Sequence, residues 1–325
     1  MVWMVDVPFE GLGVAIITPF TKDGEKVDKA SFRGLINFQI ENGVQAIIAT
    51  GTTGESPTLD HIEHKQVIDL ALEYAAGRVP VIAGTGSNNT EEAIGLSRHA
   101  EKAGANGLLI VSPYYNKPTQ DDLSRHFSDV AHSTQLPVIV YDIVGRCGVL
   151  INPNTRIEML QRAENIVGFK EASGFAHFAE SYDAIEHLRN LGKVKQKVGY
   201  WSGDDNITHR VVRYAKTKPE VKSGVISVLG NIDPEGTRAY VDAALDLRVS
   251  MDTVLDLFFL RTEALSAAMF LETNPKPVKT AAYMMGLIDH PTLRAPLYAM
   301  KDANVKKLEE TLKQYNLLRT PVASQ

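Results

Sequence analysis

The 325-residue sequence contains a single cysteine, Cys147, and no long hydrophobic run. One cysteine excludes a disulfide within the chain and gives no reason to expect an oxidising compartment. No apolar segment approaches the roughly 20 residues that a membrane-spanning helix needs. The N-terminal segment also lacks the basic region and the long apolar region of a signal peptide. We therefore expect a cytoplasmic protein that makes no use of a membrane.

The chain also lacks a strong excess of charge of either sign. Lysine and arginine number 34 against 39 aspartates and glutamates, for a formal net charge of −5. The charges are spread along the sequence, so nucleic acid is not expected as a partner. Hydrophobic residues make up 44% of the chain and charged residues 22%, which is the balance of an ordinary globular enzyme.

Short apolar segments rich in valine and isoleucine alternate with segments of helical periodicity. The apolar segments are largely continuous, as expected for parallel strands that are covered on both faces. Eight such strands in strict alternation with helices predict an α/β fold, a closed (β/α)8 or TIM barrel, rather than an open sheet. The predicted strands are residues 13–20, 44–50, 79–84, 106–112, 136–142, 165–171, 196–202 and 223–229.

Several predicted helices have start signals. Asn89 and Thr119 each stand three residues before an acidic residue, which predicts a capping box at both positions. Asp233 is followed by a proline, which is a preferred first residue of a helix. Beyond it the pattern is helical only, so we expect a catalytic barrel over residues 1–231 and a C-terminal helical region over residues 232–325.

Chemistry in such a barrel gathers where the strands end, and Lys170 lies near the end of the sixth predicted strand. Burial there would disfavour the ammonium, and the neutral amine is the form that attacks a ketone. The alternative is a lysine whose ammonium reaches solvent. Tyr141 ends the fifth predicted strand, where its hydroxyl would either relay protons beside an amine or simply face solvent.

Two further segments follow strand ends. Gly51–Ser56 could hold a carboxylate through successive amides, although a tight turn would favour the same residues. Tyr114 and Tyr115 are adjacent, so in an extended chain their side chains point to opposite sides. They would serve different environments, or form an aromatic rim against a neighbouring subunit.

These segments occur together in one known family. From about residue 11 to about residue 317 the sequence resembles the superfamily of dihydrodipicolinate synthase and N-acetylneuraminate lyase. The matching segments are Gly51–Ser56, Tyr114–Asn116, Tyr141 with Arg146 and Gly148, Gly168–Ala172, Ser202–Asp205, Gly224–Ser227 and Asn274-Pro275.

The resemblance implies that Lys170 forms an imine with pyruvate. Thr52, Tyr141 and Tyr115 would form a proton relay, with Tyr115 supplied by the partner subunit of a tight dimer. The amides of Thr52 and Thr53 would hold the pyruvate carboxylate. The other substrate-binding residues would be Arg146, Gly203 and Ile226, the last through its carbonyl group.

Arg146 bears on the second substrate. In the synthases an arginine at this place receives the carboxylate of L-aspartate 4-semialdehyde, which suits a guanidinium. The alternative is a surface arginine paired with Asp142. The synthases typically show Tyr-Asn-x-Pro-x-Arg-Thr-Gly, whereas this chain has Asp142 and no proline. We therefore expect a freer loop here and a negative charge near an anionic substrate.

The expected reaction is a Schiff-base condensation of pyruvate with L-aspartate 4-semialdehyde, early in lysine biosynthesis. No metal or nucleotide cofactor is expected, since the nine histidines form no His-x-His or HExxH pattern. The alternatives are a related aldolase of sugar acids and a catalytically weakened paralogue that binds lysine. The resemblance also implies a homo-oligomer, a dimer of dimers.

Finally, the resemblance implies feedback inhibition by lysine at the dimer interface. Glu92 would pair with the α-ammonium group, and Asn88 and Tyr114 would donate to the carboxylate. The simpler interpretation of Glu92 is the capping box begun by Asn89. The implied lysine-binding residues are Ser56, His61, His64, Asn88, Glu92 and Tyr114.

Overall fold

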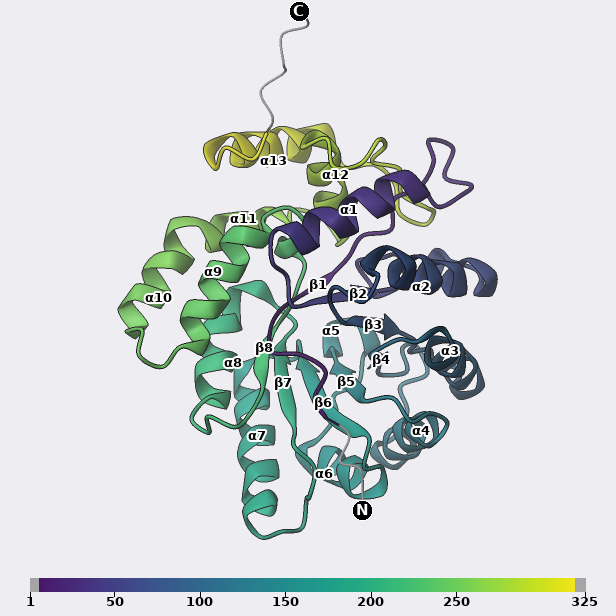
Figure 1. Cartoon of the computed structure of the whole chain (residues 1–325), viewed down its shortest axis with the longest axis vertical. Coiled ribbons are helices and arrows are strands. Elements are labelled where there is room, and N and C mark those ends of the chain that lie inside the picture. Colours follow the sequence, from purple (N-terminus) through teal and green to yellow (C-terminus); the bar gives the residue numbers. More distant parts are fainter. Residues whose placement is uncertain (1–5, 319–325) are drawn as a thin grey trace, which may run out of the picture.

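The computed structural model describes residues 6–318 (Figure 1). Eight parallel strands close into a barrel in the order of the sequence, and β1 pairs with both β2 and β8. The predicted barrel and all eight of its strands are confirmed. The strands are β1 (Gly11–Ala15), β2 (Ala46–Ala49), β3 (Val81–Gly84), β4 (Gly107–Val111), β5 (Val138–Asp142), β6 (Ile166–Glu171), β7 (Gly199–Ser202) and β8 (Ser223–Ser227).

The predicted end of the first strand, at residue 20, is wrong by five residues. Beyond Ala15 the amide of Ile17 donates to the side chain of Asn231 at 3.0 Å instead of to a neighbouring strand. Pro19 then follows, which has no amide hydrogen to donate to a ladder. The apolar run continues past the strand because these residues are still buried.

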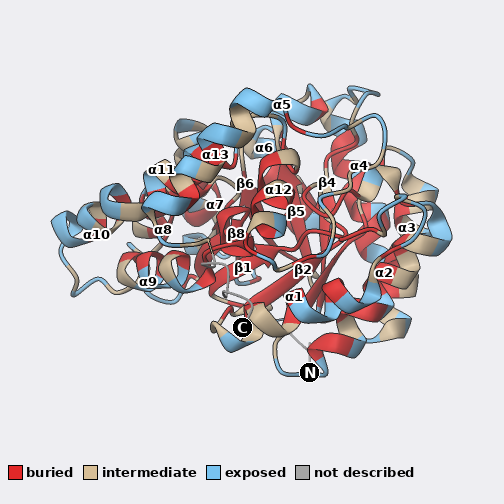
Figure 2. Ribbon diagram, turned by 90° about the horizontal axis from the view of Figure 1, so that it is seen from above, coloured by how far each residue is buried: buried red, intermediate tan, exposed pale blue. Residues whose placement is uncertain are grey.

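Helices form the outer layer, and Figure 2 shows the buried strands inside a ring of helices whose outer faces are exposed. Thr119 makes the predicted capping box with Asp122. At Asn89 the box is absent, because Asn89 caps the amide of Glu91. The helices that follow β1 to β7 are α1 (Lys29–Glu41), α2 (His61–Ala75), α3 (Thr90–Ala103), α4 (Gln120–His132), α5 (Val144–Cys147), α6 (Pro153–Arg162), α7 (Phe175–Asn190) and α8 (Thr208–Ala215).

The chain after β8 is helical, as predicted. Asp233 caps α9 (Pro234–Leu245) by accepting from the amide of Gly236, and α9 packs against α8, β1 and β8. The boundary between the barrel and the helical region, at residue 231, stays a prediction. The predicted start of the barrel and the predicted end of the helical region fall in residues 1–5 and 319–325, outside the described residues. The remaining elements are α10 (Met251–Leu257), the π-helical turn Phe258–Thr262, α11 (Glu263–Ala268), α12 (Lys276–Met284) and α13 (Asp302–Gln314).

Apolar side chains fill the barrel. Phe9 stacks on Trp201 with ring centroids 4.9 Å apart, and both pack with inward-facing aliphatic residues of the strands. Tyr141 and Lys170 stand near the C-terminal ends of β5 and β6, so they rise from this apolar floor. Within residues 6–318, no helix is both long and apolar enough to cross a membrane.

Candidate active site

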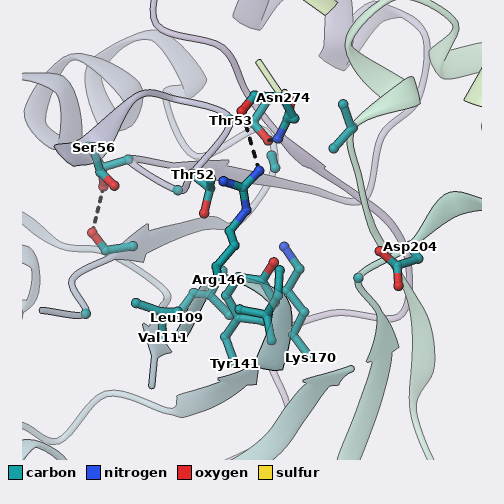
Figure 3. A pocket seen from close by; sticks show the side chains of 18 of the residues that line it. Thr52, Thr53, Ser56, Leu109, Val111, Tyr141, Arg146, Lys170, Asp204 and Asn274 are labelled. Atoms are coloured by element: carbon teal, nitrogen blue, oxygen red, sulfur yellow. Dashed lines mark hydrogen bonds between the residues drawn. The ribbon is translucent and has the colours of Figure 1, made fainter. Parts of the chain in front are cut away.

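A cavity opens at the C-terminal ends of the strands, between the loops that follow them (Figure 3). Its walls come from β1, β3, β4, β5 and β6, from the turns after β2 and β7, and from the segment before α12. It brings together residues that are far apart in the sequence. Six of the eight predicted catalytic and substrate-binding residues line it, namely Thr52, Thr53, Tyr141, Arg146, Lys170 and Gly203.

Lys170 and Tyr141 form the centre of this cavity. They are register partners on the paired strands β6 and β5, and the Lys170 Nζ lies 4.1 Å from the centroid of the Tyr141 ring. Lys170 is 6% exposed, so its amine does not extend into solvent. Burial lowers the pKa of Lys170 to about 8 and raises the pKa of Tyr141. Near neutral pH the amine is thus closer to its reactive form, while the phenol keeps its proton.

Two acidic residues after β7 act on the lysine. Burial raises the pKa of both Asp204 and Asp205, and their negative charges oppose the fall in the pKa of Lys170. Asp204 lines the cavity but received no role from the sequence. The available signal was its place directly after a strand end. Gly203 makes room for the amine, since a Cβ there would lie 3.1 Å from Lys170 Cε.

The turn after β2 presents unused donors. Gly54 and Glu55 close the turn by donating to the carbonyls of Gly51 and Thr52 at 3.0 and 3.1 Å. Within residues 6–318 no hydrogen bond uses the amides of Thr52 and Thr53. Successive free amides of this kind form a binding place for an anion.

Asn274, which precedes α12, completes the wall beside this turn. Its Nδ2 donates to Thr53 Oγ1 at 3.0 Å, and its carbonyl oxygen lies 3.4 Å from Arg146 Nη2 (Figure 3). Asn274 therefore connects the turn with the arginine. The sequence analysis noted Asn274-Pro275 as a matching segment but gave it no function.

The expectation that Asp142 places a negative charge near the substrate is wrong, and so is the alternative that it pairs with Arg146. Tyr141 points into the barrel, so the next residue of the strand, Asp142, points to the outer side. Asp142 is fully buried there and pairs with Arg156 at 2.7 Å. Its charge is balanced behind the strand and does not face the cavity. The segment without the family's proline forms α5, closed by Gly148 at φ 70°.

Two predicted residues are not brought into this cavity of the single chain. Tyr115 is 91% exposed, has a positive φ of 68° and lies outside the cavity wall. Ile226 is buried in β8, and its side chain packs in the barrel interior. A contact of Tyr115 with a substrate would need the site of a partner subunit. A contact of Ile226 would need its carbonyl group rather than its side chain.

A second cavity adjoins the first, and the two share wall residues that include Thr52 and Arg146. Glu92, which does not form the predicted capping box, accepts from Ser87 Oγ and lies 3.0 Å from His61 Nε2. Asn88 lies outside the wall. The other five residues of the predicted lysine-binding set line this second cavity, namely Ser56, His61, His64, Glu92 and Tyr114.

His64, in the wall of this second cavity, is buried. Burial lowers its pKa, so near neutral pH the ring is uncharged. Its Nε2 lies 2.8 Å from the carbonyl oxygen of Gly84 and donates to it. Among residues 6–318, no three His, Cys, Asp or Glu side chains are grouped so that they could hold a metal ion.

A buried amine with a lowered pKa reacts with ketones to give imines. The barrel and this lysine together define the class of the protein, a Schiff-base-forming lyase. The profile of the dihydrodipicolinate synthetase family matches residues 8–315, and the chain belongs to that family.

Individual relatives match almost the whole chain. A 4-hydroxy-tetrahydrodipicolinate synthase of Persephonella marina is 42% identical over 311 residues, which are 96% of this chain and 100% of the relative. The chloride-inhibited dihydrodipicolinate synthase of Acinetobacter baumannii, solved in complex with pyruvate, is 36% identical with a TM-score of 0.85, covering 95% of this chain and 99% of the other. The enzyme of Cyanidioschyzon merolae, solved with lysine bound, is 32% identical with a TM-score of 0.86, covering 96% and 100%.

Proposed function

We propose that this protein condenses pyruvate with L-aspartate 4-semialdehyde, the reaction of the 4-hydroxy-tetrahydrodipicolinate synthases. The observation that carries the proposal is the buried Lys170 with its lowered pKa, beside Tyr141 at the barrel mouth. The name of the 42% identical relative supports the reaction. Arg146 in the cavity wall favours an aldehyde that carries a carboxylate over a long uncharged sugar chain.

The chemistry begins at Lys170. Its neutral Nζ attacks the ketone carbon of pyruvate, and proton transfers through Tyr141 and Thr52 release the ketone oxygen as water and leave an imine. Loss of a methyl proton gives the enamine, whose carbon attacks the aldehyde carbon of the second substrate. The substrate's own amino group then attacks the imine carbon, which closes the ring and frees Lys170. No divalent ion takes part in these steps.

The substrate carboxylates have separate binding places. The amides of Thr52 and Thr53 hold the carboxylate of pyruvate, and Arg146 holds that of the semialdehyde. A relative solved with pyruvate supports the first substrate. Gly203 and the carbonyl of Ile226 complete the site around the imine.

Tyr115 completes the proton relay from a second copy of the chain. Its 91% exposure and its place outside its own cavity support a role at a dimer interface rather than in the same subunit. Two such dimers form the tetramer, and the protein works in the cytoplasm. The barrel of residues 1–231 carries the covalent chemistry, with residues 232–325 as its helical extension.

Lysine inhibits the enzyme by binding in the second cavity. Glu92 is free of helix capping and pairs with the α-ammonium, while Tyr114 donates to the carboxylate. The relative solved with lysine supports this ligand. The wall shared with the first cavity is the route by which bound lysine alters catalysis.

Trapping with borohydride tests the reaction. Incubation with pyruvate and borohydride adds a reduced pyruvyl group to Lys170, and peptide mass mapping locates it. Lys170→Ala takes up no label, while the control Lys313→Ala, at an exposed lysine, labels like the wild type. Labelling at another lysine contradicts the mechanism. Turnover of a sugar acid instead of the semialdehyde contradicts the assigned second substrate.

A further inference from the structure

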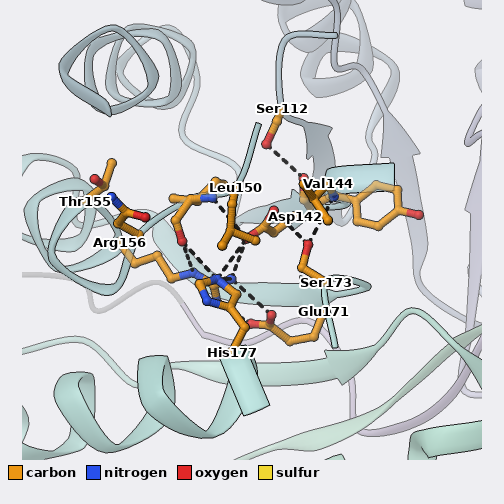
Figure 4. A network of polar contacts seen from close by, with 12 residues as sticks. Ser112, Asp142, Val144, Leu150, Thr155, Arg156, Glu171, Ser173 and His177 are labelled. Atoms are coloured by element: carbon orange, nitrogen blue, oxygen red, sulfur yellow. Dashed lines mark hydrogen bonds and ion pairs between the residues drawn. The ribbon is translucent and has the colours of Figure 1, made fainter. Parts of the chain in front are cut away.

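A buried polar cluster lies on the outer side of β5 and β6, behind the catalytic cavity (Figure 4). None of the proposed chemical steps uses it. Its charged members Asp142, Arg156 and Glu171 are almost completely buried. Burial of three charges is costly unless each is closely paired, so their arrangement calls for an explanation.

The cluster follows from the register of the two strands. Tyr141 pairs with Lys170, and the next residues, Asp142 and Glu171, pair with each other. Because side chains alternate along a strand, the first pair faces the cavity and the second faces outward. The outward pair therefore lies directly behind the catalytic pair.

One guanidinium joins the two outward carboxylates. Arg156, from α6, binds Glu171 through both of its terminal nitrogens, and its Nη2 lies 2.7 Å from Asp142 Oδ2. Burial alone would raise the pKa of Asp142, but hydrogen bonds from His177 and Arg156 hold it below its usual value. The Asp142 carboxylate is therefore charged at neutral pH and fixed in place.

Asp142 also attaches both ends of the segment that carries Arg146. At the near end its Oδ1 accepts from Ser173 Oγ at 3.1 Å, and that Oγ accepts from the amide of Val144, the first residue of α5, at 3.1 Å (Figure 4). At the far end its Oδ2 accepts from the amide of Ile151 at 3.3 Å. A single carboxylate thus bonds directly to Arg156, to Ser173 and to the amide at the far end of the loop, and it reaches the start of α5 through Ser173.

We propose that Asp142 is a positioning residue, which holds Arg146 in register with Lys170 and Tyr141 by way of Ser173. Its effect falls on the substrate that Arg146 binds and not on pyruvate. The inference rests on the proposed function, because it takes Arg146 as the group that receives the semialdehyde carboxylate. It assigns a positioning role to this residue, which stands where the family typically has an asparagine.

Ser173→Ala tests the link, since it removes the hydroxyl between Asp142 and Val144 and leaves the Arg156 pairs in place. We expect the KM for L-aspartate 4-semialdehyde to rise about fivefold, the equivalent of one neutral hydrogen bond. The KM for pyruvate and the borohydride trapping rate stay at wild-type values. Ser173→Thr keeps the hydroxyl and restores the KM. Ser133→Ala is the control, because Ser133 is a serine whose hydroxyl is also hydrogen-bonded, here to the carbonyl of Val130, but it lies after α4, away from α5.

Asp142→Asn separates geometry from charge. An asparagine oxygen can still accept from Arg156 and Ile151, and its amide can donate to Ser173. The KM for the semialdehyde should therefore stay near the wild-type value. Asp142→Ala removes all of these bonds and should raise the KM for the semialdehyde at least as much as Ser173→Ala. Equal effects of Asp142→Asn and Asp142→Ala would overturn the geometric role.

Arg146→Ala distinguishes this inference from the proposed function. If Arg146→Ala leaves the KM for the semialdehyde unchanged, the proposed role of Arg146 fails. If Arg146→Ala raises that KM but Ser173→Ala does not, or Ser173→Ala raises the KM for pyruvate equally, the positioning role is overturned. In the double variant, Ser173→Ala should add no further increase to that of Arg146→Ala, because both act through one contact.

Discussion

Lys279 Nζ lies 2.5 Å from Glu55 Oε1, and both side chains are buried, so an ion pair joins α12 to the turn that carries Thr52 and Thr53. Glu55 adopts the left-handed conformation at φ 56°, and its other oxygen accepts from the amide of Arg294 at 3.1 Å. The C-terminal helical region thus fixes the donors of the proposed pyruvate site.

Removal of the cation from this pair should destabilise the fold. Lys279→Met leaves Glu55 as a buried charge without its cation, which lowers the free energy of unfolding by about 3–5 kcal/mol. The KM for pyruvate should also rise, since the turn is no longer held. Denaturant titration and steady-state kinetics measure the two effects. The control is Lys313→Met, whose exposed pair with Glu309 contributes about 0.5 kcal/mol or less. Equal losses in both variants would contradict the prediction.

Capture of pyruvate should depend on pH through Lys170. The reactive neutral amine is the minority form below the pKa of about 8, so the rate of imine formation should rise roughly tenfold per pH unit and level off above it. Asp204→Asn removes a negative charge that favours the ammonium, so the midpoint should move to lower pH. Quenched-flow trapping followed by mass spectrometry gives the profile. The exposed Asp252→Asn should leave the midpoint in place; an upward move in Asp204→Asn would refute the assignment.

Subunit mixing should test Tyr115. Tyr115→Phe and Lys170→Ala chains are each nearly inactive alone. After random exchange, half of the dimers are mixed and each has one intact site, so about a quarter of the wild-type activity should return. Native mass spectrometry confirms the exchange. No recovery in exchanged dimers would place Tyr115 outside the partner's site.

Lysine titration should test the second cavity. Millimolar lysine should inhibit the wild type, and Glu92→Ala should raise the inhibitory concentration about 10- to 100-fold, the value of a charged hydrogen bond. Glu91→Ala is the matched control, since the neighbouring side chain is exposed and does not line the cavity. Full activity of the wild type in millimolar lysine would remove the regulatory proposal and leave the catalytic one intact.

The barrel could be predicted from the sequence because its information is local. Each parallel strand is a short apolar run, and the strand-end rule then selects Lys170 and Tyr141 without knowledge of any contact. The predicted strand ends were less accurate where residues stay buried after the hydrogen bonds between strands have ended. Ile17 is an example, because its amide donates to a side chain.

The contacts that complete the site depend on residues far apart in the sequence. Asn274 and Thr53 are separated by 221 residues, and no local pattern relates them. Asp142 was expected to act on the substrate because the sequence does not reveal its buried partner, Arg156. Which face of the helix of Arg156 packs against the strand is known only from the folded structure. The contacts of Glu92 also depend on the fold. Its carboxylate does not cap the start of its helix but contacts Ser87 and His61.

The pairing of β1 with β8 has a consequence for synthesis of the chain. Residues 11–14 pair with residues 224–227, which are synthesised much later. The turn after β2 contacts Asn274, Lys279 and Arg294, which are synthesised later still. Contacts over such sequence separations form slowly and cannot form before both segments exist. A nascent chain that contains Lys170 but not yet Asn274, Lys279 and Arg294 therefore lacks the contacts that hold the proposed pyruvate site.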